Sequence, residues 1–514
     1  MVENSSPPID EISPEDWQKT PESVKRLVTN WLEQLGQLGQ LVELIEQLER
    51  QYEEVKSENQ LLKEQVNQNS QNSSRPPSQD MGKGQSKREK RQGNKKPGAQ
   101  PGHEGHERPL YSVEQCQTVE DHYPSECIYC GESLTGKDHE PYRIQTVELP
   151  KVVPQVREHR FHALRCQRCS GYTRAWDAEI INGSGYGERI VAHVGVLSGQ
   201  YRQSHRMVQE LLDELFGVKI SLGSINQLRQ ESCQALAQVV EEAHQYVQRQ
   251  SHVNMDETGF AQGNGDGNNP TGHKGWLWVM VTPWVSYFAV FLGRSQQVCQ
   301  QLLGERFDGI VSSDRFSAYT PLNLEQRQIC WAHLKRDFTR IGERPGVAGE
   351  LGQALLAQQK LLFEHWYRVR DGTLGRPEFI RVVNPIRQQI RTLLEAGAGY
   401  AIGKGEKTPL AKTVRTCQQL LKVESALWTF VTVEGVEPTN NAAERALRPA
   451  VLWRKNSFGS QSQQGSLFVS RMLTVVTTLR SQNRPVVDYL VEVCRAARQG
   501  QPVPSLLPAD SSTP

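Results

Sequence analysis

The stretch HVNMDETGF, residues 252–260, decides the fold of the largest part of this chain. Its alternating start predicts a short strand that ends in two adjacent carboxylates. After a polar, glycine-rich segment, WLWVMV and YFAVFL predict two more strands. A predicted helix over 294–307, capped by Ser295, leads into DGIVSSDRFSAY (308–319), a buried strand that ends at Asp314. The order is therefore strand, strand, strand, helix, strand.

That order is typical of a ribonuclease-H-like α/β core, in which the first and fourth strands lie side by side. Asp256 and Asp314, which belong to those two strands, are then expected to converge. Converging carboxylates repel each other unless a cation lies between them. The pattern predicts two Mg²⁺ (or Mn²⁺) ions and phosphoryl-transfer chemistry. An Asp at a strand end is more often a turn residue, so the prediction depends on a third ligand.

The third carboxylate is expected from a later helix. The best candidate is Glu444 in TNNAAERALRPA (439–450), where Thr439 or Asn440 can cap a helix that carries Glu444 near its start. A carboxylate on such a helix can point back to the sheet. The weaker candidates, which fall in a predicted loop, are Glu434 and Glu437.

The interval between Asp314 and this helix is too long for a direct return to the sheet. Residues from about 341 to 433 have helical patterns, which predicts a helical insertion.

Just before this insertion, Cys330 and His333 have a metal-pair spacing, but a lone CxxH is weak evidence. His333 is expected to support the site or contact DNA, unless it only packs at a helix start. Basic residues near Glu444 are expected to meet DNA phosphates, or else to form a solvated face: Arg445, Arg448, Arg454 and Lys455.

Two CxxC pairs predict a structural zinc site. CIYC contains Cys127 and Cys130, and CQRC contains Cys166 and Cys169. Each pair can direct two thiolates at one tetrahedral Zn²⁺ ion. Residues 142–165 between them predict the two strands of a zinc-ribbon-like hairpin. Ordinary reduced cysteines are the alternative, and other nearby ligands are Cys116, His122 and His139.

Residues 188–237 predict helices with a break. Gly217 suits a helix end, and Ser221 or Ser224 suits the N-cap of the next helix. This is typical of a helix-turn-helix whose second helix contacts DNA. Such patterns also arise by chance in helical segments, so simple helical packing stays open.

The N-terminal region predicts a coiled coil and a basic arm. From Leu38 to Val66 apolar residues step by three and four, with Asn59 at an a position, which favours a homo-oligomeric coiled coil. An amphipathic helix packed on its own chain is the alternative. Residues 82–106 form a basic run among Gly, Pro and Gln that predicts a flexible linker, with phosphate binding as an added hypothesis. Its candidate DNA contacts are Lys87, Arg88, Lys90, Arg91, Lys95 and Lys96.

Composition limits the remaining possibilities. The 514 residues are 37% hydrophobic, which is enough for at least one large core, and the net charge of +1 does not announce a polyanion partner. The N-terminus lacks the pattern of a secretory signal, and ten cysteines without one predict a reducing, cytoplasmic location. The most apolar stretch, residues 276–292, is interrupted by polar residues and Pro, so it predicts two strands rather than a membrane helix.

Together these motifs resemble those of a DDE transposase of the insertion sequence 66 family. The resemblance covers nearly the whole chain in order: the zipper arm, NSSRPPSQD, KKPGAQPGHEGH, the CxxC pairs, MDET, SSDRFSAY, CWAHLKR and NNAAERALRP. It implies that Asp256, Asp314 and Glu444 form the DDE triad, that the cysteines hold zinc, and that the enzyme cuts and joins the ends of its own element. It also implies helper proteins encoded beside it. The departures, Ala99 for a usual Gly and Phe316 for a usual Tyr, remove no metal ligand.

The sequence therefore predicts a multidomain α+β and α/β protein that acts on DNA. Two other functions stay open: a zinc-containing DNA-binding regulator with an inactive core, and a ribonuclease-H-like nuclease that does not join strands. The predicted domains are an acidic coiled-coil arm (1–70), a basic linker (71–112), a zinc module (113–180), a helical DNA-binding segment (185–248), a catalytic domain (249–495) with its insertion, and a flexible tail (496–514).

Overall fold

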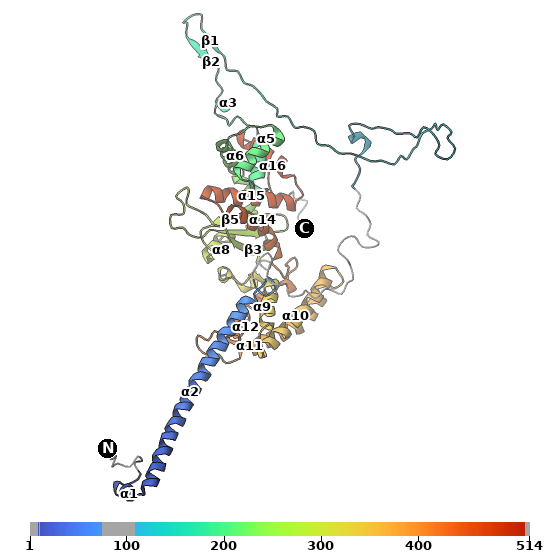
Figure 1. Ribbon diagram of the computed structural model, residues 1–514. Helices are drawn as coiled ribbons and strands as arrows, with labels where there is room; N and C mark the ends of the chain where they lie inside the picture. The colour runs from blue at the N-terminus through green and yellow to red at the C-terminus, as the bar shows by residue number, and fades with distance from the viewer. Residues whose placement is uncertain (1–8, 10, 74–107, 509–514) are drawn as a thin grey trace. The chain divides into compact units, whose positions relative to one another are not determined.

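The computed structural model describes residue 9, residues 11–73 and residues 108–508 (Figure 1). These form two compact units, each built from separate segments of sequence. The sheet unit takes its described residues from 1–83 and 244–459, and the helical unit takes them from 84–243 and 460–514. Helices and strands occur together, as the sequence predicts for a mixed α and β protein.

One five-stranded mixed sheet organises the sheet unit. Its spatial order is β5-β4-β3-β6-β7. Strand β3 pairs antiparallel with β4 and, on its other side, parallel with β6, with Asn254 opposite Ser312. The first and fourth strands are therefore neighbours. The elements are β3 (His252–Gly259), β4 (Trp276–Val281), β5 (Ser286–Phe291), α8 (Gln296–Leu303) with the predicted N-cap Ser295, β6 (Ile310–Ser313), η3 (Ser317–Tyr319), η4 (Leu324–Gln326) and β7 (Arg327–Ile329).

The centre of this sheet is buried on both faces. Leu277, Trp278 and Val279 follow one another in β4, and all three are fully buried. A strand covered on both sides needs no polar residues between its apolar ones, which explains the unbroken run WLWVMV. The most apolar stretch of the chain is thus two strands, as predicted, and among the described residues no helix is long and apolar enough to cross a membrane.

Between β7 and α14 (Asn441–Ser457) the chain forms helices with a core of their own. Trp366 packs edge-on against Phe430, with ring centroids 5.3 Å apart, and Phe379 contacts both rings. Trp331 joins this core and donates its indole N–H to the Leu427 carbonyl oxygen at 2.8 Å. The helices are α9 (Trp331–Gly342), α10 (Val347–Arg370), α11 (Arg376–Ala398), α12 (Pro409–Lys422), η5 (Ser425–Leu427) and α13 (Thr429–Thr432).

The N-terminal arm is helical. After the short α1 (Pro14–Lys19), α2 (Glu22–Val66) runs for 45 residues without a break (Figure 1). Its apolar seam is exposed: Leu41 and Leu48 leave 56% and 54% of their surface accessible. An exposed apolar seam on a long helix is typical of pairing with another helix.

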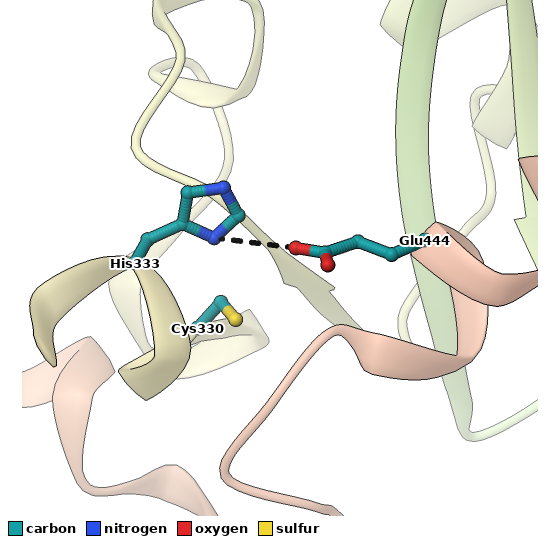
Figure 2. Close-up of side chains that lie close together, drawn as sticks. All are labelled: Cys330, His333 and Glu444. Carbon is teal, nitrogen blue, oxygen red and sulfur yellow. Dashed lines mark ion pairs between the residues drawn. The ribbon is translucent and has the colours of Figure 1, made fainter. Parts of the chain in front are cut away.

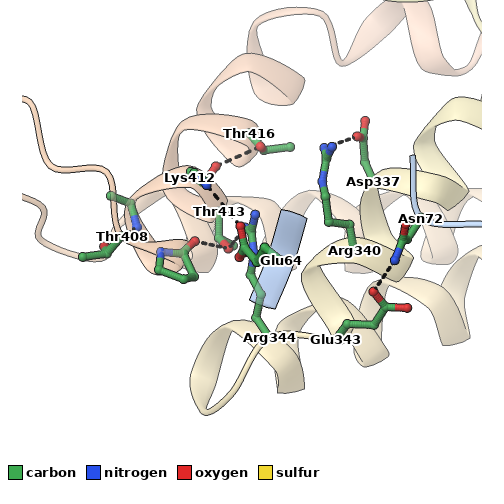
Figure 3. A network of polar contacts seen from close by, with 12 residues as sticks. Glu64, Asn72, Asp337, Arg340, Glu343, Arg344, Thr408, Lys412, Thr413 and Thr416 are labelled. Carbon is green, nitrogen blue, oxygen red and sulfur yellow. Dashed lines mark hydrogen bonds and ion pairs between the residues drawn. The ribbon is translucent and has the colours of Figure 1, made fainter. Parts of the chain in front are cut away.

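The C-terminal end of α2 is tied to the helices of the insertion by partly buried polar contacts (Figure 3). Glu64 accepts hydrogen bonds from Arg344 at 2.9 Å and from Lys412 at 3.1 Å. Just beyond the helix, the Asn72 amide donates to Glu343 at 2.6 Å. Burial lowers the pKa of Arg344, and the charge of Glu64 opposes that shift. The Glu64 carboxylate therefore offsets part of the cost of burying the guanidinium.

The helical unit confirms the two predicted helix signals. Helix α5 (His205–Phe216) ends at Gly217, whose φ of 64° is left-handed. Helix α6 (Leu222–Ala235) begins after Ser221, whose Oγ accepts from the Ser224 N–H at 3.0 Å. Helix α6 packs against α4 and against two helices that lie beyond residue 460. From the sequence, those two helices were expected to belong to the catalytic domain and not to the helical segment. The other helices of this unit are α4 (Glu188–Gly199), α15 (Gln463–Ser481) and α16 (Val486–Arg498).

The predicted strands between the two CxxC pairs are mostly absent. Residues 135–162 contain no helix or strand, so the hairpin predicted over 142–165 is wrong except in its last three residues. An alternating segment becomes a strand when one face is buried, and here Leu149 and Val156 stay 85% and 88% exposed. The remaining elements are η2 (Val113–Gln115), an antiparallel pair of β1 (Ala163–Arg165) with β2 (Tyr172–Arg174), α3 (Ala178–Asn182) and α7 (Ala237–Gln248).

Replacing Glu64 by Gln is expected to destabilise the sheet unit. The change leaves the Arg344 guanidinium, which is only 5% exposed, without its charged acceptor. We expect the free energy of unfolding to fall by about 1–3 kcal/mol, measured by denaturant unfolding with tryptophan fluorescence. The control Glu53→Gln breaks only an exposed pair with Lys56 and should leave the midpoint unchanged. Equal midpoints for the two variants would contradict the prediction.

Candidate active site

The two predicted aspartates come from neighbouring inner strands of the sheet. Asp256 is in β3, and Asp314 directly follows β6. The last pair of the parallel register is Asn254 with Ser312, and Asp256 and Asp314 each lie two residues beyond it. The third carboxylate, Glu444, is in the first turn of α14, which packs on β3 and β4.

Asp256 is a buried carboxyl group that has other carboxylates near it. Burial raises its pKa well above the ordinary value, and the charge of Glu257 adds to the shift. The charges of Asp314 and Glu444 raise the pKa further, while the Glu257 N–H, 2.9 Å from Asp256 Oδ1, opposes them. The charges of the other two predicted carboxylates thus add to the shift at Asp256, and like charges near one another favour a bound cation or a shared proton.

Asn440 fixes the start of α14 against the sheet. It is fully buried, and its side-chain amide donates to the Met255 carbonyl oxygen at 2.7 Å, next to Asp256. Its backbone N–H donates to Cys330 Sγ at 3.1 Å. Asn440 is the N-cap residue, as one of the two sequence alternatives had it, but its side chain bonds β3 rather than the first turn of its own helix. The position of Glu444 is thereby set relative to β3.

Helix α9 brings His333 to Glu444 (Figure 2). His333 Nδ1 lies 3.7 Å from Glu444 Oε1, and Arg336 lies 3.5 Å from the same oxygen. Burial and the Arg336 charge lower the pKa of His333, which favours the neutral ring. Among the described residues, Cys330, His333 and Glu444 are the one group of three or more Cys, His, Asp or Glu whose ligand atoms all lie within 4.8 Å of one another. The predicted aspartates are not part of that group.

A buried polar network beside Asp256 was missed by sequence analysis. Glu257, on the opposite face of β3, accepts hydrogen bonds from Arg294 Nε at 2.7 Å and from the Tyr319 hydroxyl. The Arg294 guanidinium also lies over the ring of Phe316, 3.4 Å from its centroid. This network joins β3 to the segments that follow β5 and β6. The sequence signal for this network was a charged residue, Glu257, in the middle of a predicted strand. Its partners could not be identified from the sequence because they lie far away along the chain.

The predicted DNA-contacting residues have different environments. Arg445, Arg448 and Lys455 expose their side chains on α14. Arg454 instead donates to Thr258 Oγ1 at 2.8 Å, so its guanidinium holds α14 on β3. The six candidates of the basic run lie outside the described residues: Lys87, Arg88, Lys90, Arg91, Lys95 and Lys96.

Each CxxC pair forms the same tight turn. Backbone N–H groups two and three residues further on lower the pKa of Cys127 and of Cys166. A left-handed residue closes each turn, Gly131 in the first and Ser170 in the second. Turns that direct N–H groups at a sulfur favour the thiolate, which is the form that binds metal. The structure does not bring three of the four cysteines within 4.8 Å of one another, so it contains the two halves of the predicted site separately.

Comparisons with known proteins give two kinds of match. A sequence profile described as Transposase IS66 family matches residues 183–467, and one described as a family of unknown function matches residues 21–109. Uncharacterized protein y4qI of Sinorhizobium fredii is 25% identical over 413 residues, which cover 75% of this chain and 73% of that protein. Uncharacterized protein y4hP of the same organism is 24% identical over 405 residues, 72% and 70% of the two chains.

The pairing of β3 with β6 predicts a pH-dependent stability. His252 Nε2 lies 2.8 Å from Ser312 Oγ, and burial lowers the pKa of His252 from 6.5 to about 4. The unfolded chain then binds this proton more readily, so stability is lost as the pH falls from about 6.5 towards 4. The loss reaches up to about 3 kcal/mol. Unfolding free energies measured across this range should depend less on pH in His252→Gln, whereas the exposed control His159→Gln should behave as wild type. An unchanged pH profile in His252→Gln would refute this assignment.

Proposed function

This chain belongs to the Transposase IS66 family, and we propose that it binds the ends of its own insertion sequence and cuts and joins DNA there by a DDE mechanism. The observation that carries the proposal is the parallel pairing of β3 with β6, whose last pair, Asn254 with Ser312, precedes Asp256 and Asp314 by two residues each. The charge of Glu444 acts on the same site. Three carboxylates from two strands and a helix supply the oxygen ligands that two-metal phosphoryl transfer needs.

The sheet unit supports a ribonuclease-H-like core with a helical insertion. Its order β5-β4-β3-β6-β7 combines an antiparallel three-stranded run with two parallel neighbours. Helices α10 to α13 occupy the interval between the second and third carboxylates. In this proposal the insertion supports α9 and α14 from outside the sheet, and the sheet carries the chemistry.

The donors of the site suit Mg²⁺ or Mn²⁺. Asp256, Asp314 and Glu444 offer oxygen atoms, which hard divalent cations prefer. Burial is the main cause of the raised pKa of Asp256, and the neighbouring carboxylates add a repulsion that a cation would relieve. Two ions held there would activate the attacking oxygen and stabilise the leaving one.

The protein's own contribution is to hold these carboxylates in place. The Phe316 N–H donates to Asp314 Oδ1 at 2.8 Å, and Arg327 donates to the Asp314 carbonyl oxygen at 3.4 Å. Asn440 holds the start of α14, and Glu257 stiffens β3 next to Asp256. Carboxylates that cannot rotate away need less reorganisation when charge develops on the phosphate.

The exposed basic residues of α14 supply a DNA surface in this proposal. Arg445 and Arg448 lie within one turn of Glu444 and are free of the sheet contact that engages Arg454. Phosphate contacts of this kind would position DNA without reading its sequence. The basic run and helix α6 would add contacts elsewhere, and helper proteins encoded by the same element would assist.

Assembly is proposed to occur through α2. Two DNA ends must be held together for joining, which requires more than one subunit. The exposed seam of α2 suits a homotypic coiled coil, in which each helix buries the apolar residues of the other. We also propose that the enzyme acts in the cytoplasm, associated with DNA.

The two cysteine turns are proposed to hold one structural Zn²⁺. Each presents a thiol to which backbone N–H groups are directed, and four thiolates make a closed tetrahedral site. Cys166→Ser should therefore remove about one zinc per chain, measured by elemental analysis of the purified protein. Cys116→Ser tests the alternative ligand, and its zinc content should equal that of wild type. Equal zinc in all three proteins would exclude this assignment.

Asp314→Asn should abolish metal-dependent cutting and joining while leaving binding to the element's ends intact. The change removes a charged ligand but keeps the shape of the side chain. The assay uses labelled DNA carrying those ends, with Mg²⁺ and with EDTA, and Asp308→Asn, an exposed neighbour, is the matched control. Cutting that persists in Asp314→Asn would remove this residue from the triad. In wild type, binding without cutting would favour a regulator, and cutting without joining would favour a nuclease.

A further inference from the structure

The arrangement of backbone N–H groups around the first sulfur of each CxxC turn recurs at Cys330, the N-cap residue of α9 inside the candidate active site. In both CxxC turns, backbone N–H groups two and three residues beyond the first cysteine are directed at its sulfur. Cys330 receives the same two contacts, from the N–H groups of Ala332 and His333. A third N–H, from Asn440, lies 3.1 Å from its Sγ. Burial, the larger effect, raises the pKa of Cys330, and these N–H groups oppose that shift. The residue three positions on is a histidine.

The chain places a third donor opposite this turn. The ligand atoms of Cys330, His333 and Glu444 all lie within 4.8 Å of one another (Figure 2). His333 Nδ1 and Glu444 Oε1 are 3.7 Å apart, too far for a hydrogen bond and close enough to share an ion. A thiol, an imidazole and a carboxylate from two helices thus point at one volume.

His333 supplies an independent reason for a ligand. Its Nδ1 is buried and has no hydrogen-bond partner in the described part of the chain. A buried polar atom without a hydrogen-bond partner costs free energy. A histidine at a helix start is therefore expected to form a hydrogen bond with its own helix or with a neighbouring group. A bound cation would satisfy this atom.

We propose that Cys330, His333 and Glu444 bind one zinc-class ion, separate from the Mg²⁺ or Mn²⁺ pair. Thiolate and imidazole ligands select Zn²⁺ over Mg²⁺, which prefers oxygen. Three protein ligands leave a fourth position for water or another small ligand. On binding, the ion takes the place of Arg336 beside Glu444 Oε1. Cys330 loses its thiol proton when the ion binds.

The ion would act as a positioning device for Glu444, an inference that rests on the proposed role of this residue in the triad. It joins the start of α9 to the start of α14, elements more than one hundred residues apart in sequence. Both ion-pair contacts described for Glu444 use Oε1. With Oε1 held by the zinc-class ion, Oε2 is the atom available to the aspartate side of the site.

The test measures metal binding in the full chain. A background variant, Cys127→Ser with Cys166→Ser, removes the zinc expected at the two CxxC turns. It is compared with the same chain carrying Cys330→Ser or, as a second variant, His333→Gln. Cys417→Ser, which alters a buried thiol in the insertion, is the matched control. Zinc per chain is counted after equilibration with Zn²⁺ and gel filtration, and Co²⁺ replaces zinc to detect a thiolate-to-cobalt absorption band.

The background and the Cys417→Ser protein should keep about one zinc per chain and a cobalt–thiolate band, and both signals should disappear with Cys330→Ser. With His333→Gln, zinc affinity should fall about 10–100-fold or more. Absence of zinc and of the cobalt band in the background protein would overturn the proposal, and so would their persistence in Cys330→Ser. Neither readout requires DNA cleavage, so a failed cleavage assay would count against the proposed function and not against this site.

Discussion

The parallel pairing of β3 with β6 is the contact on which the candidate active site depends. Three residue pairs fix its register, from His252 with Ile310 to Asn254 with Ser312. Side chains alternate along a strand, so a slip of one residue would turn Asp256 to the other face of the sheet. The buried side chains of Val253 and Met255 make that slip costly, because it would bring them towards water. Apolar packing therefore sets the positions of the polar groups.

Buried polar side chains then set the rest of the geometry. Asn440 reaches the Met255 carbonyl across 185 residues of sequence, and Tyr319 reaches Glu257 across 62. In a low-dielectric interior such contacts are favourable only when every partner is in place. They therefore hold α14 and the segment after β6 in one arrangement, and they leave the carboxylates little freedom.

Helix α9 joins two features that are far apart in sequence. Its N-terminal turn carries His333 beside Glu444. Of the residues directly after it, Arg344 contacts the end of α2 and Glu343 contacts the segment just beyond α2. The proposed assembly helix and the third carboxylate are thus supported from the two ends of one 12-residue helix.

The sequence by itself determined the local elements: the strand order around Asp256, the caps at Ser221 and Ser295, the long α2 and the helices of the insertion. These follow from periodicity and capping, which act within a few residues. The sequence predicted strands near Leu149 that are absent from the structure, because an alternating pattern does not by itself bury one face of a segment. Only the tertiary structure decided that Asn440 bonds β3, that Arg454 holds α14 on the sheet, and that Cys330 and His333 meet Glu444. Those contacts depend on which groups, far apart in sequence, are buried together in the folded chain, and no local pattern contains that information.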